Sequence, residues 1–234
     1  MHYDFKIKMD RVDTLNNPDF NILEIDWLLN EAQLVFLKQR YGMNNSKHQG
    51  FESTQKRIDD LSTLHIKFPE QSGIPVIFEQ GIYEAALNNL KYKYLFFLRA
   101  EVDVLLEGCA KRIPIKFIQS DDLSECLKDP FNSSSLDYII YNVGRSSLNE
   151  GTSIYLYPGK YTLSTLYPEY VKYPSRITYG NYTYIDGNTY TQTNCELPEQ
   201  THPEIVDIAV QLAALNVENP EYIQLKNMKL NIQE

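Results

Sequence analysis

The sequence contains few of the residues on which common catalytic and metal-binding motifs depend. Only 3 of its 234 residues are cysteines; they form no CxxC pair, and their odd number argues against a disulfide framework or a thiolate zinc site. Glycine is scarce, at 10 residues, and there is no Walker loop, no GxSxG and no GxGxxG after a strand. The sequence therefore indicates no catalytic, cofactor-binding or metal-binding residue, and predicts that the protein is not an enzyme.

Positive charge is also in short supply, since 22 Lys and Arg stand against 31 Asp and Glu, a net charge of −9. Binding of DNA phosphates requires clustered Lys and Arg, and no such cluster appears, so duplex DNA is not expected as a ligand. An acidic surface can instead let DNA pass without adhering to it. The chain has no apolar run of the roughly 20 residues that a membrane span needs and no apolar signal segment, which predicts a soluble, intracellularly made protein.

The two ends of the chain show the periodicity of helices. Residues 19–41 place Ile25 and Phe36 on one apolar face, and further apolar residues widen this face beyond what a single neighbour would cover. A more polar helix is expected over 52–63. Residues 203–216 are apolar on nearly all sides, which predicts a helix that is central in the core or shared with a neighbouring subunit.

The stretch ELPEQTHPEIVDIAVQ, residues 196–211, gathers four acids and a histidine, and either a metal or proton site or a helix start would explain it. Thr201 followed by Glu204 forms a capping box, and Pro203 suits the first turn of a helix. A metal site would need a second histidine at helical spacing, which is absent. We therefore interpret the stretch as a helix start.

The middle of the chain shows the two-residue period of strands. Apolar and charged residues alternate over 98–104, which predicts a β-hairpin over 94–119, followed by a short helix at 120–128 capped by a serine. The short apolar pieces within 64–78 suit a small hairpin or two edge strands, and IYEAALNNL (82–90) is interpreted as a short helix.

Strand-like segments follow one another from 136 to 194, and ten tyrosines lie between Tyr155 and Tyr190. Ordinary β-propensity is one explanation, because tyrosine is a good strand residue. An interaction surface is another, because tyrosine offers a large rigid contact area with a polar tip. A platform for stacking on sugars is a third, and the sequence leaves the three open.

These patterns together predict an α+β fold. We expect a mainly helical part over 1–93 and a β-rich, antiparallel part over 94–195 that includes the helix at 120–128. The segment 196–234 is expected to contribute a C-terminal helix that packs with the N-terminal helices as one domain, and an arm that reaches toward a partner.

Several stretches together resemble one family, among them FNILEIDWLLNEAQLVFLKQRYG, YLFFLRAEVDV, RIPIKFIQSDDLSECLKDPFN and NCELPEQTHPEIVDIAVQLAALNVENPEYIQLKNMKLNIQE. They are similar to the ring proteins stacked below the portal at the head–tail junction of crAss-like bacteriophages, and the similarity covers nearly the whole chain. It implies a virion component, made in the host bacterial cytoplasm, that forms a homo-oligomeric ring of twelve copies matching a portal. It also implies contacts with the portal protein and neighbouring ring or tail proteins, and a channel through which DNA passes without specific binding.

A ring needs two different contact surfaces on each subunit. We predict subunit contacts, with intramolecular packing as the alternative for each residue, at Trp27, Phe36, Tyr167, Tyr170, Tyr173, Leu212 and Tyr222. The segment 196–234 carries seven acids and two lysines, so we expect it, rather than 151–195 with two acids and three bases, to line the channel.

Two other functions compete with the ring. One is a carbohydrate-binding, receptor-recognition module of a phage tail, in which the tyrosines would stack on sugars. The other is a hydrolase that uses a pair of facing carboxylates, a site that the 31 acids would permit although nothing in the sequence selects a pair.

Overall fold

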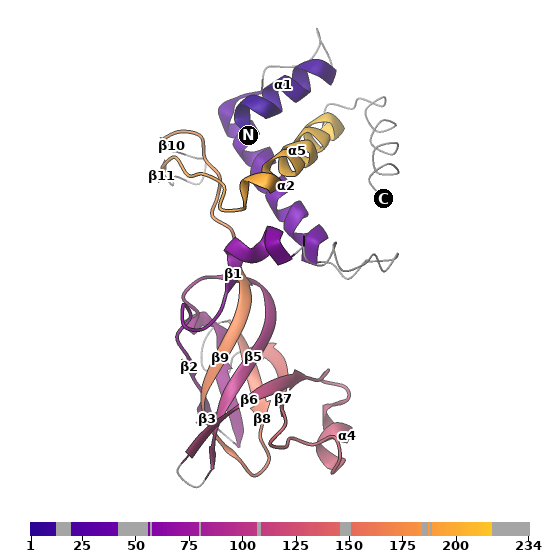
Figure 1. Ribbon diagram of the computed structural model, residues 1–234, viewed down its shortest axis with the longest axis vertical. Coiled ribbons are helices and arrows are strands. Elements are labelled where there is room, and N and C mark those ends of the chain that lie inside the picture. Colours follow the sequence, from indigo (N-terminus) through magenta and orange to yellow (C-terminus); the bar gives the residue numbers. More distant parts are fainter. Residues whose placement is uncertain are drawn as a thin grey trace. The chain divides into compact units, whose positions relative to one another are not determined.

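A computed structural model describes residues 1–12, 20–41, 56, 58–79, 81–106, 109–145, 151–183, 187 and 189–216. The chain folds into two compact units, one formed by Met1–Leu64 with Pro174–Glu234 and the other by His65–Tyr173. The first unit holds the long helices and the second holds the large sheet (Figure 1). The α+β class expected from the sequence is confirmed.

The helical unit is built on α1 (His2–Val12), α2 (Ile22–Tyr41) and α5 (His202–Asn216). Both α1 and α2 pack against α5, which confirms that N-terminal helices pack with the C-terminal one. The sequence patterns did not predict α1, which buries Phe5 and Met9. The core also includes the apolar stripes of α2 and α5, namely Ile25, Leu28, Leu29, Ala32, Phe36, Leu37, Ile205, Val206, Ala209, Val210, Ala213 and Ala214.

Short elements complete this unit. Of the helix expected over 52–63, residues 58–61 are helical and continue into η1 (Ser62–Leu64). The antiparallel strands β10 (Tyr182–Thr183) and β11 (Thr189–Tyr190) follow the β unit, and η3 (Glu199–Thr201) leads into α5.

The β unit contains nine strands that belong to one sheet in the order β1-β9-β5-β6-β7-β8-β4-β3, with β2 also paired to β9. The strands are β1 (His65–Ile66), β2 (Ile74–Pro75), β3 (Ile77–Glu79), β4 (Ile82–Ala86), β5 (Tyr94–Leu106), β6 (Cys109–Phe117), β7 (Ile139–Arg145), β8 (Thr152–Tyr157) and β9 (Thr162–Lys172). The predicted hairpin of 94–119 is confirmed as β5 and β6, and the alternating residues Ala100, Val102 and Val104 are buried.

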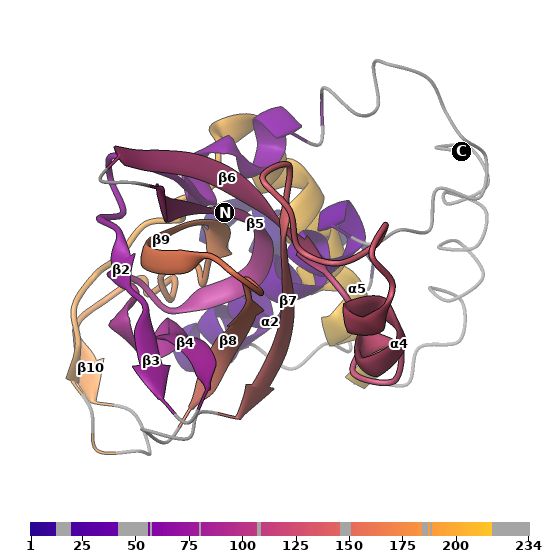
Figure 2. The same cartoon turned by 90° about the horizontal axis from the view of Figure 1, so that it is seen from below.

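One short segment joins the two edges of this sheet. Residues Ile74 and Pro75 pair with β9, whereas Ile77–Glu79 pair with β4, so consecutive residues of the chain close the sheet on itself (Figure 2). Closure leaves one face inside, where side chains fill a continuous apolar core. Its buried members are Ile74, Ala85, Leu87, Ala100, Val102, Val104, Ile113, Ile139, Tyr141, Ile154, Leu156, Leu163 and Leu166.

The helix expected over 82–90 is wrong. Residues 82–86 form β4, which pairs with β3 and β8, and only η2 (Leu87–Asn89) is helical, as a short 3-10 turn. The alanines and leucines favour a helix locally, but burial of Ala85 and Ala86 against the sheet overrides this preference.

The strand pairs of the sheet are antiparallel, as expected, except that β6 and β7 pair in parallel. Parallel neighbours need a crossover of a dozen or more residues. Residues 118–138 provide it and contain α4 (Leu123–Lys128), the predicted short helix, which begins after Asp122 rather than at a serine cap. The boundaries of the compact units fall at 64/65 and 173/174, whereas the sequence patterns place divisions at 93/94 and 195/196.

Candidate subunit-contact surfaces

Four of the predicted contact residues lie at least partly at the surface of their unit. Trp27 on α2 is 45% exposed, and Tyr173, directly after β9, is 40% exposed. Tyr167 on β9 and Leu212 on α5 are half-buried. An exposed tryptophan is a large apolar group that a partner can cover, so Trp27 gives the helical unit its strongest candidate contact.

Two other predicted contact residues are inside. Phe36 is 1% exposed in the helical core, and Tyr170 is 0% exposed in the β unit, where its hydroxyl donates to Gln71 Oε1 at 3.0 Å. Burial raises the pKa of Tyr170, which keeps it a neutral donor. Intramolecular packing, the alternative considered for each residue, accounts for both. Tyr222 lies outside the described residues.

The strand tyrosines bond mainly within the chain. Among those described between positions 155 and 182, only Tyr173 and Tyr179 are strongly exposed. The hydroxyls of others donate to acceptors of the same unit, as in Tyr155 to Arg145 O, Tyr157 to Asn142 Oδ1, Tyr167 to Asp103 Oδ2 and Tyr182 to Asp26 Oδ2. Such bonding favours the strand-propensity explanation over an open platform for sugars.

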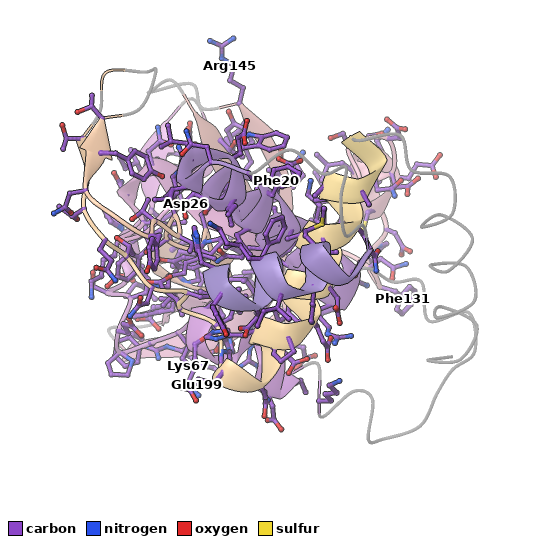
Figure 3. All side chains as sticks on the ribbon, turned by 90° about the horizontal axis from the view of Figure 1, so that it is seen from above. Phe20, Asp26, Lys67, Phe131, Arg145 and Glu199 are labelled. Carbon is purple, nitrogen blue, oxygen red and sulfur yellow. The ribbon has the colours of Figure 1, made fainter. Side chains whose placement is uncertain are left out.

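A buried carboxylate on α2 organises the helical unit. Asp26, which is labelled in Figure 3, is 0% exposed. Its Oδ1 lies 2.6 Å from Nε2 of His2. Its Oδ2 accepts hydrogen bonds from the Tyr182 hydroxyl at 2.6 Å and the Tyr179 N–H at 3.1 Å. The His2 ring also stacks on Tyr179, with centroids 4.6 Å apart. One acid therefore joins the N-terminus, α2 and the segment that follows the β unit.

Asn30, one turn further along α2, extends this contact. Its Nδ2 donates to Ile177 O and its Oδ1 accepts from Ile177 N, both at 2.8 Å. Burial raises the pKa of the Asp26 carboxyl, but the hydrogen bonds from His2, Tyr182 and Tyr179 outweigh it, and the pKa is lowered. The carboxylate stays ionised at neutral pH. The signal that sequence reasoning missed is an acid inside the apolar face of a helix.

The start of α5 confirms the helix-start interpretation, but not the capping box. The Thr201 hydroxyl donates to Pro198 O at 2.7 Å, and the Glu204 carboxylate instead pairs with Arg40 and, at 2.9 Å, with Lys56. The Glu204 carboxylate, which would have completed the capping box, thus forms ion pairs with Arg40 and Lys56 instead. Among the described residues, no group of three or more His, Cys, Asp and Glu could hold a metal ion.

Arg40 links α2 to two acids, because its Nε also lies 3.0 Å from Oδ2 of Asp60, which is 1% exposed. Replacing Arg40 by alanine should lower the free energy of unfolding by about 1–3 kcal/mol, because the buried Asp60 would lose its charged partner, and its remaining contact among the described residues is the Gln200 amide at 3.3 Å. Urea denaturation measures this. The matched control is Arg99→Ala, which removes a well-formed but exposed pair with Glu169 and should cost less than about 1 kcal/mol. Equal losses in the two variants would contradict the argument.

Tyr167 belongs to a cluster on the outside of the β unit. The Arg112 guanidinium lies 3.7 Å from the centroid of the Tyr167 ring and 5.3 Å from that of Phe68. Asp103 accepts from both the Tyr167 hydroxyl at 2.9 Å and Arg112 at 3.3 Å. Phe68 is 50% exposed, so the cluster offers a partner an aromatic edge beside a fixed cation.

Each of the two units thus exposes aromatic side chains that a partner can cover. The chain matches the family described as phage tail ring protein 3/4 over residues 2–221, and it belongs to this family of crAss-like phage ring proteins. The resemblance seen in the sequence is confirmed. The family is structural and not an enzyme family. No curated protein sequence matches the chain.

Within the described residues no helix is long and apolar enough to cross a membrane.

Proposed function

We propose that the chain forms a homo-oligomeric ring below the portal, at the head–tail junction of the virion, and continues the DNA channel from capsid to tail. The observation that carries this proposal is the family match, which extends over residues 2–221 and so spans both compact units rather than one of them. The proposed ring has twelve copies, in register with a twelvefold portal, and its partners are the portal protein and neighbouring ring or tail proteins. Its role is assembly and not catalysis.

The distribution of charge supports a channel that DNA crosses without binding. The residues of the helical unit carry 18 Asp and Glu against 11 Lys and Arg, whereas the β unit has 13 against 11. Seven of the nine net negative charges are therefore in the helical unit. Acidic groups repel phosphates, and without clustered cations no counterion release favours DNA binding. We propose that the acid-rich C-terminal segment, with α5 at its start, faces the channel.

Exposed apolar groups in both units support assembly into a ring. Besides Trp27, the surface of the described chain exposes Phe68, Phe78, Phe117 and Phe131 to at least half of their area. Large exposed aromatic side chains such as these supply anchor residues when a partner covers them. A closed ring requires two different contact surfaces on each subunit that meet head to tail. The exposed aromatic side chains of the two units are candidates for these surfaces.

The copy number of the chain in purified virus particles tests the proposal. Quantitative mass spectrometry should give a ratio of one to the portal protein, because a ring that matches the portal shares its symmetry. Image reconstruction of the neck would then locate the ring. A copy number that follows the tail fibres would favour the carbohydrate-binding alternative, and absence from the particle would favour the hydrolase; either result would contradict the connector.

A further inference from the structure

Phe131 is the most exposed large apolar side chain of the described residues. It is 92% exposed, in the turn that follows α4, and Leu127 (41%) and Leu136 (37%) flank it. We call residues 121–137, which include α4 and this turn, the knob. Because Phe131 buries almost none of its surface within the monomer, its burial by a partner would contribute most of the transfer free energy of the side chain to association.

Hydrogen bonds hold the backbone of the turn that carries Phe131. Asp129 Oδ1 accepts from the Phe131 N–H at 2.9 Å, and Asp129 Oδ2 accepts from Asn132 Nδ2 at 2.6 Å. The Ser133 N–H bonds to Asp129 O at 2.9 Å, and the Cys126 thiol lies 3.2 Å from Asn132 O. Because the backbone of this turn is already ordered, binding has to order only the rotamers of the Phe131 side chain, which lowers the entropy cost of using it as an anchor.

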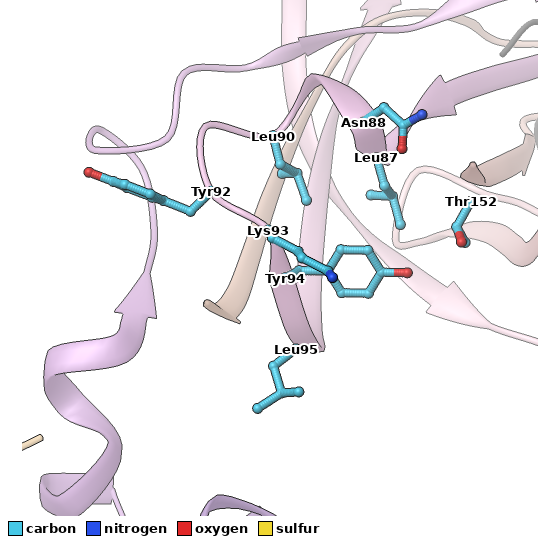
Figure 4. Close-up of a pocket in the computed structure, with 8 residues that line it drawn as sticks. All are labelled: Leu87, Asn88, Leu90, Tyr92, Lys93, Tyr94, Leu95 and Thr152. Carbon is cyan, nitrogen blue, oxygen red and sulfur yellow. The ribbon is translucent and has the colours of Figure 1, made fainter. Parts of the chain in front are cut away.

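The same unit carries a pocket of about 650 Å³ between the end of β4 and the start of β5. It is lined by Leu87, Asn88, Leu90, Tyr92, Lys93, Tyr94, Leu95 and Thr152. In Figure 4, Leu87, Leu90 and the Tyr94 ring are drawn between Tyr92 and Thr152, and the Tyr92 side chain points away from Thr152. The pocket is large and apolar enough to receive an aromatic side chain.

Phe131 cannot fill the pocket of its own chain. Ser134 in the knob bonds to Tyr157 O and accepts from the Ile140 N–H at 2.9 Å, which fixes the knob at the start of β7 and the end of β8. Thr152 in the pocket pairs with Arg145 at the opposite ends of these strands. The seven residues of β7 separate the two features by about 20 Å at 3.3 Å per residue.

The charges of the two features are complementary. The knob has five acids and one lysine, and Asp121, Asp122 and Glu125 are exposed. The pocket segment, residues 85–98, has two lysines and no acid, and Lys91 and Lys93 are both exposed. Oppositely charged surfaces at two ends of one unit fit a head-to-tail contact between copies.

We propose that Phe131 of one copy inserts into the Leu87–Leu90–Tyr94 pocket of the next copy, with the acids of the knob facing Lys91 and Lys93. The contact deepens the proposed function, on which it rests, because it names the two surfaces that close the ring. It uses a second copy of this chain and no other partner.

The first test removes the anchor. Phe131→Ser should weaken self-association of the purified full-length chain about 30-fold or more in sedimentation velocity, as loss of an interface hot spot does. Phe78→Ser, which removes another exposed phenylalanine of the same unit, should leave association unchanged. Because both positions are exposed, both variants should keep the native circular dichroism spectrum. Equal association of Phe131→Ser and the wild-type chain would overturn the contact.

The second test reverses charge on one side at a time. Lys91→Glu with Lys93→Glu gives a chain with an acidic pocket and an acidic knob. Changing Asp121, Asp122 and Glu125 together to lysine leaves the knob with four lysines and two acids, and so gives a chain with two basic surfaces. Each chain alone should associate at least about 10-fold more weakly than wild type, because like charges meet at its contact. An equimolar mixture should recover association, because every knob then meets an oppositely charged pocket when the two chains alternate.

The outcomes separate the contact from the ring itself. Failure of the mixture to associate better than either chain alone, or a wild-type chain that stays monomeric at millimolar concentration, would overturn the self-contact. Loss of Phe131→Ser from particles with unchanged self-association would indicate that another virion protein receives the knob, and would also overturn it. The particle copy number decides the proposed function independently, because it does not depend on which residues touch.

Discussion

Replacing Asp26 by alanine is expected to lower the free energy of unfolding of the chain by about 3–5 kcal/mol, as loss of one member of a buried charged network does. The carboxylate has no exposed surface, and three donors, from His2, Tyr179 and Tyr182, converge on it. The alanine variant would remove the buried acceptor that these three groups share. Urea denaturation followed by tryptophan fluorescence measures the loss, since Trp27, the single tryptophan, is the next residue of α2.

The dependence on pH distinguishes the carboxylate from simple packing. The pKa of Asp26 is lowered in the folded chain, so its contribution is fully present above the unfolded value of about 3.9 and is lost as pH falls through the lower folded value. The stability difference between wild type and Asp26→Asn should therefore be constant near neutral pH and shrink in acid. A difference that persists unchanged at low pH would contradict the ionised state.

Asp207→Ala is the matched control for this variant. Asp207 is an acid of the same unit that pairs with Lys8 at 2.7 Å, but it is 46% exposed. Solvent screens such a pair, so its loss should cost less than about 1 kcal/mol. A loss as large as that of Asp26→Ala would show that burial of the carboxylate is not the cause of its effect.

The parts of the fold that could be predicted are those in which one face of an element is buried. The alternation over 98–104 specifies a strand because Ala100, Val102 and Val104 fill a closed core while the residues between them meet water. The apolar periodicity of α2 and α5 predicts helices for the same reason. These sequence patterns depend only on which face of the helix or strand is buried.

The parts that could not be predicted depend on residues distant in the chain. The local sequence around Ala85 and Ala86 favours a helix, but pairing with β8 makes these residues a strand. The residues of β8 lie far away in the sequence, so no local pattern indicates this pairing. Parallel pairing of β6 with β7 is equally hidden, because it is set by how the crossover through α4 returns to the sheet.

The candidate surfaces show the same limit. Sequence composition drew attention to tyrosines, yet Tyr170 is inside and Tyr167 bonds to Asp103 and Arg112 of its own unit. No sequence pattern predicts Phe131 as a contact residue, because a single phenylalanine in a polar loop gives no periodic signal. The exposure of Phe131 depends on the conformation of the surrounding turn, which the sequence pattern does not specify.

Replacing Leu166 by alanine should destabilise the β unit by about 2–5 kcal/mol, the usual cost of a large cavity in a packed core. Leu166 is 0% exposed on β9, between Ile74 of β2 and Val102 of β5, at the place where the sheet closes on itself. A cavity there cannot be filled by movement of a free edge, because β2 and β5 hold β9 on both sides. Amide hydrogen exchange should accelerate in β5 and β9.

Leu105→Ala on β5 serves as its control, since that side chain is 44% exposed and its removal leaves no cavity. Exchange in this variant should stay close to that of the wild-type chain. Because the knob and the pocket are both built on strands of this sheet, Leu166→Ala should also weaken self-association, whereas Leu105→Ala should not. Unchanged exchange in Leu166→Ala would mean that closure of the sheet through residues 74–79 does not hold its core together.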